Sequence, residues 1–413
     1  MALNTLIAFV TQISLMLYFA KNTELTSSPR TLFITVLIYS IMAGGVFMFV
    51  SNYYSNDTFM LSKGDAMLYY KESMKVSEMG FLEGATHLMS SHDYDDWGSY
   101  FFDSFLMSII PNKLFLNLVY TVLGAFSAVF LFLIGRNYMP DVYAFMAGLA
   151  YGTSSFMIFF NCSFLKEALF VFLVVAGMYN MYQYINTNAR SSLFTGILFI
   201  GAIVFFRPAV AAFEIASIFV YYGIILKGRA ISIFLYIIAA AAFAVSLKSL
   251  QQISDTYTAG GDIDKLIAYS GRDEYSGGFN YFVCFFGAYL GPFPTLFTKI
   301  AMHPSPIQFY GSGLTHKLFL AIPLWIGAFY AIKQWVIKLF PLIAFCLFEM
   351  TSTAYICDSL ELRKVLLHVP FTYILAFYGL SHLTTETNSI RLLYAITYIF
   401  PIGVLFLWNI IRV

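Results

Sequence analysis

Charged residues are scarce in this chain. Its 413 residues include 23 Lys and Arg and 22 Asp and Glu, so 11% are charged, whereas 60% are hydrophobic. A soluble domain carries about 25% charged residues, and the mean hydropathy of +0.75 points away from that class as well. The shortage of charge excludes an ordinary soluble domain. The net charge of +1 excludes a polybasic nucleic-acid-binding protein.

Cysteine motifs, repeats and an obvious leader are also missing. The four cysteines (Cys162, Cys284, Cys346 and Cys357) form no CxxC pair, so we interpret them as packing residues. The histidines show no paired spacing of the kind that metal ligands have. Without a linker, low-complexity tract or internal repeat, residues 1–413 are expected to form a single transmembrane domain. The amino terminus lacks a basic n-region and is expected to be a retained span.

Long apolar runs dominate what is present. Residues 119–135 and 231–247 are each long enough to cross a hydrocarbon core of roughly 30 Å as a helix. The pattern predicts an all-α polytopic membrane protein with about 11–13 transmembrane helices. The stretch 281–298 contains GPFP, which breaks a helix, and is interpreted as a re-entrant or interfacial element. The expected spans are 3–20, 31–50, 113–135, 142–160, 165–185, 192–206, 208–226, 230–248, 317–333, 339–355, 365–383 and 391–410.

The charges in the short connections predict the orientation. Basic residues mark the cytoplasmic side of membrane proteins. One alternating set of connections is rich in basic residues and is therefore expected to be cytoplasmic. The remaining connections include the long loops of about 51–112 and 249–316 and the shorter 356–364, and they are expected to be periplasmic or otherwise exterior. The cytoplasmic set holds Lys21, Arg30, Arg136, Arg190, Lys227, Arg229, Lys333, Lys338 and Arg391, against the acidic residues Glu24, Asp141 and Glu386.

Polar clusters fall on the predicted exterior face. Charges this close to hydrocarbon are costly unless they are paired or functional. The clusters lie in LSKGDAMLYYKES (61–73), SSHDYDDWGSYFFDS (90–104), NCSFLKEALF (161–170), FFRPAV (205–210) and SLELRKVLLHVP (359–370). Because these clusters come from distant parts of the chain and are all predicted on one face, they favour a shared site.

Such a set suits glycosyl transfer from a lipid-linked donor. A carboxylate can take the proton of an acceptor hydroxyl; Asp65 is the leading candidate, with Asp95 and Asp96 as alternates. Cations can hold the phosphate of the leaving group. Two carboxylates could instead share a divalent cation, but no ligand spacing supports one, so no cofactor is expected and that cation is left open. The candidate substrate- and phosphate-binding residues are Lys166, Glu167, Arg207, Arg363, Lys364, Tyr69 and Tyr70.

Structural interpretations of the same residues remain open. Asp65 could be a solvated loop residue, and Lys166 could pair locally with Glu167 or extend to the headgroups. Arg207 could be an interfacial anchor at the start of a span. Glu214, within RPAVAAFEIASIF, is expected either to be hydrogen-bonded inside the bundle or to line a polar cavity.

Several landmarks resemble the GT-C superfamily of membrane glycosyltransferases, which use polyprenyl-phosphate sugars. An acidic GDAxxYY loop follows an early span, SFLKE occupies 163–167, and FRP occupies 206–208. GPFP at 291–294 and ELRKVLLHVPFTYILAFYGL at 361–380 are also similar to their counterparts there. These landmarks cover most of residues 50 to 380. The compact size is similar to Wzy-type O-antigen and capsule repeat-unit polymerases.

The resemblance implies a GT-C-like fold and a bacterial surface-polysaccharide enzyme. It implies that Asp65 is the loop acid and that Lys166, Glu167 and Arg207 lie near the lipid phosphate. The implied location is the bacterial inner membrane, with the active face periplasmic. The implied partners are an undecaprenyl-(di)phosphate-linked glycan donor, a glycan acceptor, the lipid bilayer and a chain-length regulator, with no nucleic acid.

Three alternatives stay open. One is a transporter or flippase for a lipid-linked oligosaccharide, which would favour internal repeats, broken helices and ionisable residues deep in both halves. Another is a glucosyltransferase that adds a single sugar to O-antigen. The third is a non-catalytic scaffold, which would leave the acidic exterior loops without a role.

Overall fold

The computed structural model describes residues 2–55, 63–91, 96–225, 307–356 and 366–383, with scattered positions between 396 and 410. Every regular element in these ranges is a helix and none is a strand, in agreement with the predicted all-α class. The helices are α1 (Ala2–Lys21), η1 (Thr23–Ser27), α2 (Pro29–Ser55), α3 (Lys63–Ser77), α4 (Phe81–Ser91), α5 (Trp97–Ile109), α6 (Lys113–Gly135), α7 (Asp141–Gly152), α8 (Ser155–Ser163), α9 (Glu167–Thr187), α10 (Arg190–Ile203), α11 (Pro208–Ile225), α15 (Ile307–Phe319), α16 (Ala321–Lys333), η5 (Ile337–Leu339), α17 (Phe340–Ile356) and α19 (Val369–Leu383).

Several of these helices are long and apolar enough to cross a membrane. Four meet that test within the described ranges, namely α2 over Pro29–Tyr53, α6, α9 and α11. Two bent helix pairs raise the number to as many as six, and α10 and α19 are shorter apolar helices. The described part of the chain is therefore helical, with several helices that could cross a membrane, which is consistent with a multi-pass membrane protein. The predicted spans at 230–248 and 391–410 and the element at 281–298 lie wholly or mostly outside the described residues.

Two predicted spans differ from the structure. The helix expected over 142–160 is broken into α7 and α8, which bend by 45°. At the break, the hydroxyls of Thr153 and Ser154 donate to the carbonyls of Leu149 and Tyr151, each at 2.6 Å. Such local hydrogen bonds compete with continuation of a helix, so the apolar stretch predicted as a span at 142–160 is broken at this point.

The second difference is at the predicted span 317–333. It forms one broken unit with Gly313–Phe319, bent by 45°. Helix α15 begins at Ile307, inside the stretch predicted to be exterior loop 249–316, so that loop ends earlier than expected. The two broken units are in contact, because the backbone N–H of Gly313 in α15 donates to Ser155 Oγ at the start of α8, at 2.8 Å.

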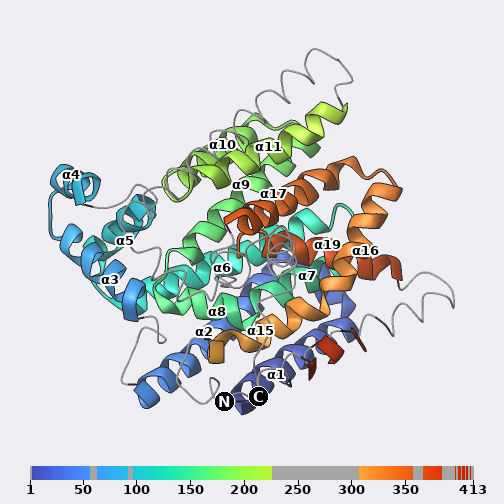
Figure 1. Ribbon diagram of the computed structural model, residues 1–413, viewed down its shortest axis with the longest axis horizontal. Coiled ribbons are helices and arrows are strands. Elements are labelled where there is room, and N and C mark those ends of the chain that lie inside the picture. The colour runs from blue at the N-terminus through green and yellow to red at the C-terminus, as the bar shows by residue number, and fades with distance from the viewer. Residues whose placement is uncertain are drawn as a thin grey trace, which may run out of the picture.

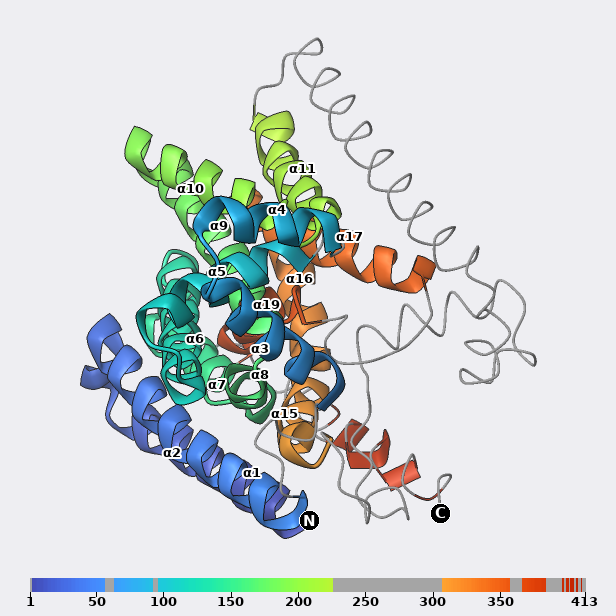
Figure 2. The same ribbon diagram turned by 90° about the vertical axis from the view of Figure 1, so that its left-hand side faces the viewer.

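The stretch 51–112, predicted to be an exterior loop, is largely helical over the residues that the structure describes. Helices α3, α4 and α5 lie together at one end of the bundle, on the left in Figure 1, and Figure 2 faces this end. The N–H of Gly98 donates to the carbonyl of Phe205 at 3.0 Å, which joins α5 to the turn between α10 and α11. We call this the α3–α5 end.

Basic turns gather at the opposite end of the long helices. Arg136, at the end of α6, pairs with Asp141 at 3.3 Å. Lys338 donates to Asn186 near the end of α9 at 2.7 Å. Tyr182 of α9 in turn donates to the Lys338 carbonyl at 2.5 Å. Arg136 and Lys338, both from the set of short connections rich in basic residues, therefore lie near the ends of α6 and α9.

The packing inside and outside the bundle follows from the apolar pattern. Helix α2 buries Leu32 and Val36 against Gly148 and Gly152 of α7. Its other face is exposed, which suits contact with lipid. The exposed residues on that face are Ile34, Ile38, Ile41, Met42, Val46, Phe49 and Tyr53.

Helices α16 and α19 cross with their backbones in contact. A Cβ atom placed on Gly327 would lie 1.8 Å from the carbonyl oxygen of Leu375, and one on Gly379 would lie 2.2 Å from that of Pro323. Only glycine permits this approach.

Candidate functional site

The turn between α8 and α9 has an unusual backbone conformation. Phe164 has φ 62° and ψ 41°, in the left-handed region, which costs a bulky residue on the order of 1–3 kcal/mol. Its buried ring packs edge-on against Tyr70, with ring centroids 5.4 Å apart. Such strain persists only where surrounding contacts hold it, and it is concentrated at functional sites. The turn brings Lys166 and Glu167 to the start of α9.

Lys166 forms an ion pair with Asp96, 70 residues away in sequence. Its ammonium contacts Asp96 Oδ1, and the Tyr69 hydroxyl donates to the same oxygen at 2.7 Å. The side chain of Lys166 is 9% exposed and that of Asp96 is 26% exposed. The cation is thus withdrawn from water, while the carboxylate remains open to it.

Arg207, the residue before α11, contacts α9 one helical turn beyond Lys166. Its guanidinium lies over the Phe170 ring, 5.9 Å from the centroid, and the Phe170 N–H donates to the Lys166 carbonyl. The ring of Phe206 also stacks on that of Phe170, with the ring centroids 5.4 Å apart. Phe206 also fills the space at Gly98, where a Cβ atom would lie 2.3 Å from the ring. Phe206 therefore packs between Gly98 of α5 and Phe170 of α9, next to Arg207.

Glu167, which follows Lys166 in the chain, is also buried. Its Oε2 has no hydrogen-bond partner within the described part of the chain. Its charge acts on Tyr69 together with that of Asp96; burial and these charges raise the Tyr69 pKa. Tyr69 therefore stays protonated and donates. We refer to Tyr69, Asp96, Lys166, Glu167 and Arg207 as the Asp96 cluster.

A further acid on α5 is Asp103. Asp103, two turns after Asp96 on α5, is buried and accepts a hydrogen bond from the Tyr120 hydroxyl. Burial raises the pKa of Asp103 to about 7, although the hydrogen bond from Tyr120 opposes the rise. Because α5 and α6 are joined through this pair, it also helps to fix the position of Asp96.

The predicted acid Asp65 lies at the edge of this arrangement. It is exposed in the first turn of α3, four residues before Tyr69, and its charge acts on Tyr100 together with that of Asp96. Asp96, predicted as an alternate, lies at the centre instead. Of the other candidates, Asp95, Arg363 and Lys364 lie outside the described residues.

Comparison with known proteins assigns no family to the chain. No protein-family model, curated protein or solved structure matches it. Across the ranges that the structure describes, no three His, Cys, Asp or Glu side chains are grouped so as to hold a metal ion. Function must therefore be argued from the side chains themselves.

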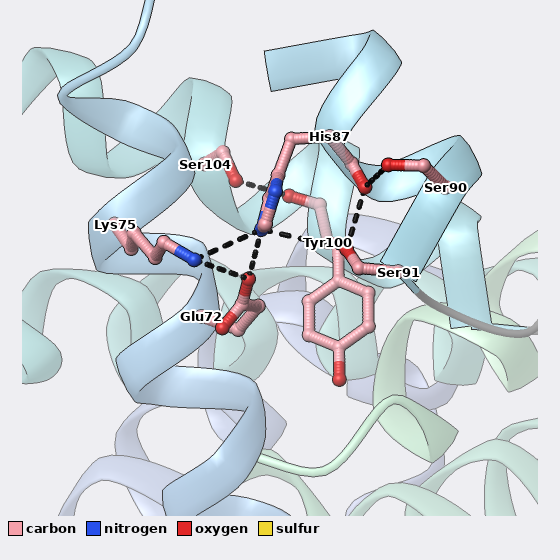
Figure 3. Close-up of polar contacts among 7 residues, drawn as sticks. All are labelled: Glu72, Lys75, His87, Ser90, Ser91, Tyr100 and Ser104. Carbon is pink, nitrogen blue, oxygen red and sulfur yellow. Dashed lines mark hydrogen bonds and ion pairs between the residues drawn. The ribbon is translucent and has the colours of Figure 1, made fainter.

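A polar clasp joins α4 to α3 near the Asp96 cluster (Figure 3). His87 Nε2 lies 2.6 Å from Glu72 Oε1 and 3.1 Å from the Lys75 ammonium. Ser91 also lies near His87, at 3.4 Å, but toward the same ring nitrogen that contacts Glu72. A nucleophile triad needs both ring nitrogens, so this group fastens a helix and does not form a serine-hydrolase site.

Sequence reasoning missed some of the buried polar residues. Glu349 of α17 is 4% exposed, and its Oε1 has no hydrogen-bond partner in the described ranges. The charge of Arg207 acts on it, so it belongs to the surroundings of the Asp96 cluster. A lone Glu in the apolar run CLFEMTST was the available signal. Tyr120 and the turn at Phe164 gave no comparable signal.

Proposed function

We propose that this protein is a GT-C-like membrane glycosyltransferase of bacterial surface-polysaccharide assembly. It transfers or polymerises glycans from a polyprenyl-(di)phosphate-linked donor. The observation that carries the proposal is the Asp96 cluster, in which a partly open carboxylate, a buried ammonium and a guanidinium meet at one end of an apolar bundle.

The charge asymmetry supports the proposed orientation. In the positive-inside rule, the basic turns face the cytoplasm. The α3–α5 end then faces the periplasm of the inner membrane, at the depth of the lipid headgroups, and the donor tail enters from the bilayer. The described basic residues of the other end are Lys21, Arg30, Arg136, Arg190, Lys333 and Lys338.

The proposed reaction uses the ion pair of the resting site. The donor phosphate binds Lys166 and Arg207 and so competes with Asp96 for the Lys166 ammonium. Asp96 then accepts the proton of the acceptor hydroxyl, whose oxygen bonds to the anomeric carbon. The bond from that carbon to the phosphate oxygen breaks, and the lipid (di)phosphate leaves with the electron pair. Direct attack inverts the anomeric carbon. Asp65 remains a second candidate for the proton acceptor.

Transport of a lipid-linked oligosaccharide is the second candidate function. Two observations favour it, the broken spans that meet at Gly313 and Ser155 and the buried ionisable residues Glu214, Lys317 and Glu349. Discontinuous helices and ionisable groups at membrane depth are common in transporters.

One assay separates these functions. The purified protein in nanodiscs is incubated with a polyprenyl-diphosphate glycan and an acceptor, and the products are separated on a gel. A ladder indicates a polymerase and one added sugar indicates a single-sugar transferase. If no product forms while the protein moves the same lipid across vesicle bilayers, the glycosyltransferase proposal fails and transport replaces it.

A further inference from the structure

Glu214 is a carboxyl group buried in the middle of the bundle that the proposed transfer does not use. It is 0% exposed, and neither of its carboxyl oxygens has a hydrogen-bond partner in the part of the chain that the structure describes. Its backbone carbonyl accepts from Ser217 at 2.7 Å, but that contact does not involve the carboxyl group. A buried carboxylate without compensation costs several kcal/mol or more, so such a group takes up a proton or a cation.

The packing around Glu214 leaves a place for its side chain. A Cβ atom on Gly177 of α9 would lie 2.6 Å from Glu214 Oε1 and 3.2 Å from a side-chain carbon of Ile200 on α10. The missing side chain of Gly177 thus provides the space that the carboxyl group occupies among α9, α10 and α11. Gly177 and Ile200, which line this space, offer the carboxyl group no side-chain hydrogen-bond partner.

Charged groups on the surrounding elements lie toward the ends of the bundle. Glu167 begins α9, and Glu349 of α17 is acted on by Arg207. Arg190 of α10 and Lys338 of η5 belong to the opposite end. No ion pair to Glu214 occurs among the described residues.

Arg207 and Glu214 stand on the same face of α11. They are seven residues apart, which is two helical turns or about 10.5 Å. Arg207 faces Phe170 of α9 and Glu214 faces Gly177, seven residues further along the same helix. A charged Glu214 would therefore be attracted along the α9–α11 contact toward the guanidinium.

We propose that Glu214 is a proton-binding site within the membrane domain, neutral in the structure described above. Release of its proton to water leaves a carboxylate that the hydrocarbon contact with Gly177 does not accommodate. Proton release is then coupled to a shift of α11 against α9, and so to the position of Arg207. This proposal is independent of the glycosyltransferase assignment, because it depends only on the surroundings of Glu214.

Infrared difference spectroscopy tests the proposal on the full chain in nanodiscs at pH 7. Subtracting the spectrum of Glu214→Gln from that of the unaltered protein should reveal the C=O band of a protonated carboxylic acid. The band should stay the same when Na⁺ is exchanged for K⁺. If the Glu214→Gln difference spectrum shows the loss of the two carboxylate bands instead of the acid band, Glu214 is ionised and the proposal fails. If the band changes when Na⁺ is exchanged for K⁺, Glu214 belongs to a cation site and the proposal also fails.

A second pair of variants keeps the test decisive if Glu214→Gln does not fold. Gly177→Ala places a methyl group against the carboxyl oxygen and should shift the acid band. The matched change Gly201→Ala on α10, where a Cβ atom would meet nothing within 4 Å, should leave it in place. An acid band that is absent, or unmoved by Gly177→Ala, contradicts the assignment.

Discussion

Single and double replacements at Asp96 and Lys166 test whether the two form a buried ion pair in the folded protein. Asp96→Asn leaves the Lys166 ammonium, 9% exposed, without the carboxylate. Breaking a buried ion pair at one partner costs about 3–5 kcal/mol. Since Asp96 is 26% exposed, we expect a smaller loss of about 2–3 kcal/mol. Lys166→Met leaves a carboxylate that keeps the Tyr69 hydroxyl and access to water, so its cost should be nearer 1 kcal/mol.

The double variant completes the cycle. Asp96→Asn with Lys166→Met buries no ammonium, so it should be more stable than Asp96→Asn alone by about 1–2 kcal/mol. Unfolding of the purified protein by heat or denaturant, followed by circular dichroism, provides the free energies. Asp141→Asn is a matched control, because it breaks the more exposed Arg136–Asp141 pair and should cost less than about 1 kcal/mol. Additive losses, or a milder effect of Asp96→Asn than of Lys166→Met, would refute the reasoning.

Two further predictions concern stability. Asp103 has a folded-state pKa of about 7 against a usual 3.8, so its contribution is complete below about pH 4 and is lost as the pH rises to 7, by up to about 1.4 kcal/mol per pH unit. The stability of Asp103→Asn relative to the unaltered protein should therefore increase between about pH 4 and pH 7, as measured by melting curves at a series of pH values. Tyr120→Phe, which removes the hydrogen bond that lowers the Asp103 pKa, should extend this pH range upward. A stability difference between Asp103→Asn and the unaltered protein that does not change with pH would contradict this. Gly327→Ala should lower the melting temperature by forcing α16 from α19, at a cost of about 1–3 kcal/mol, whereas Gly201→Ala should raise stability by about 0.5–1 kcal/mol. Equal melting temperatures for the two variants would contradict the close crossing.

Composition and apolar runs were enough to predict the helical membrane architecture. They could not reveal the bends, because the break in YGTSSF depends on Thr153 and Ser154 hydroxyls that bond back to their own helix. The same residues are compatible with a continuous helix when their side chains take other rotamers. The helix that begins at Ile307 was not predicted, because it is only moderately apolar.

The candidate site was predictable by residue type but not by arrangement. The polar clusters in the sequence include Asp96, Lys166, Glu167 and Arg207. Only tertiary packing, however, brings Asp96 and Lys166, 70 positions apart, into an ion pair. The choice of Asp65 over Asp96 rested on the resemblance of its GDAxxYY pattern to the GT-C loop. In the folded chain α3 directs Tyr69 toward Asp96, and Asp65 remains exposed one turn away.

The rate of glycan transfer by Asp96→Asn tests the central claim most directly. With a polyprenyl-diphosphate glycan donor, the account predicts a rate at least about 100-fold below that of the unaltered protein, the low end of the contribution of a proton-accepting group. Asp141→Asn, measured in the same nanodiscs, should keep its rate. Undiminished transfer by a folded Asp96→Asn protein would show that the proton is taken elsewhere and would contradict the account.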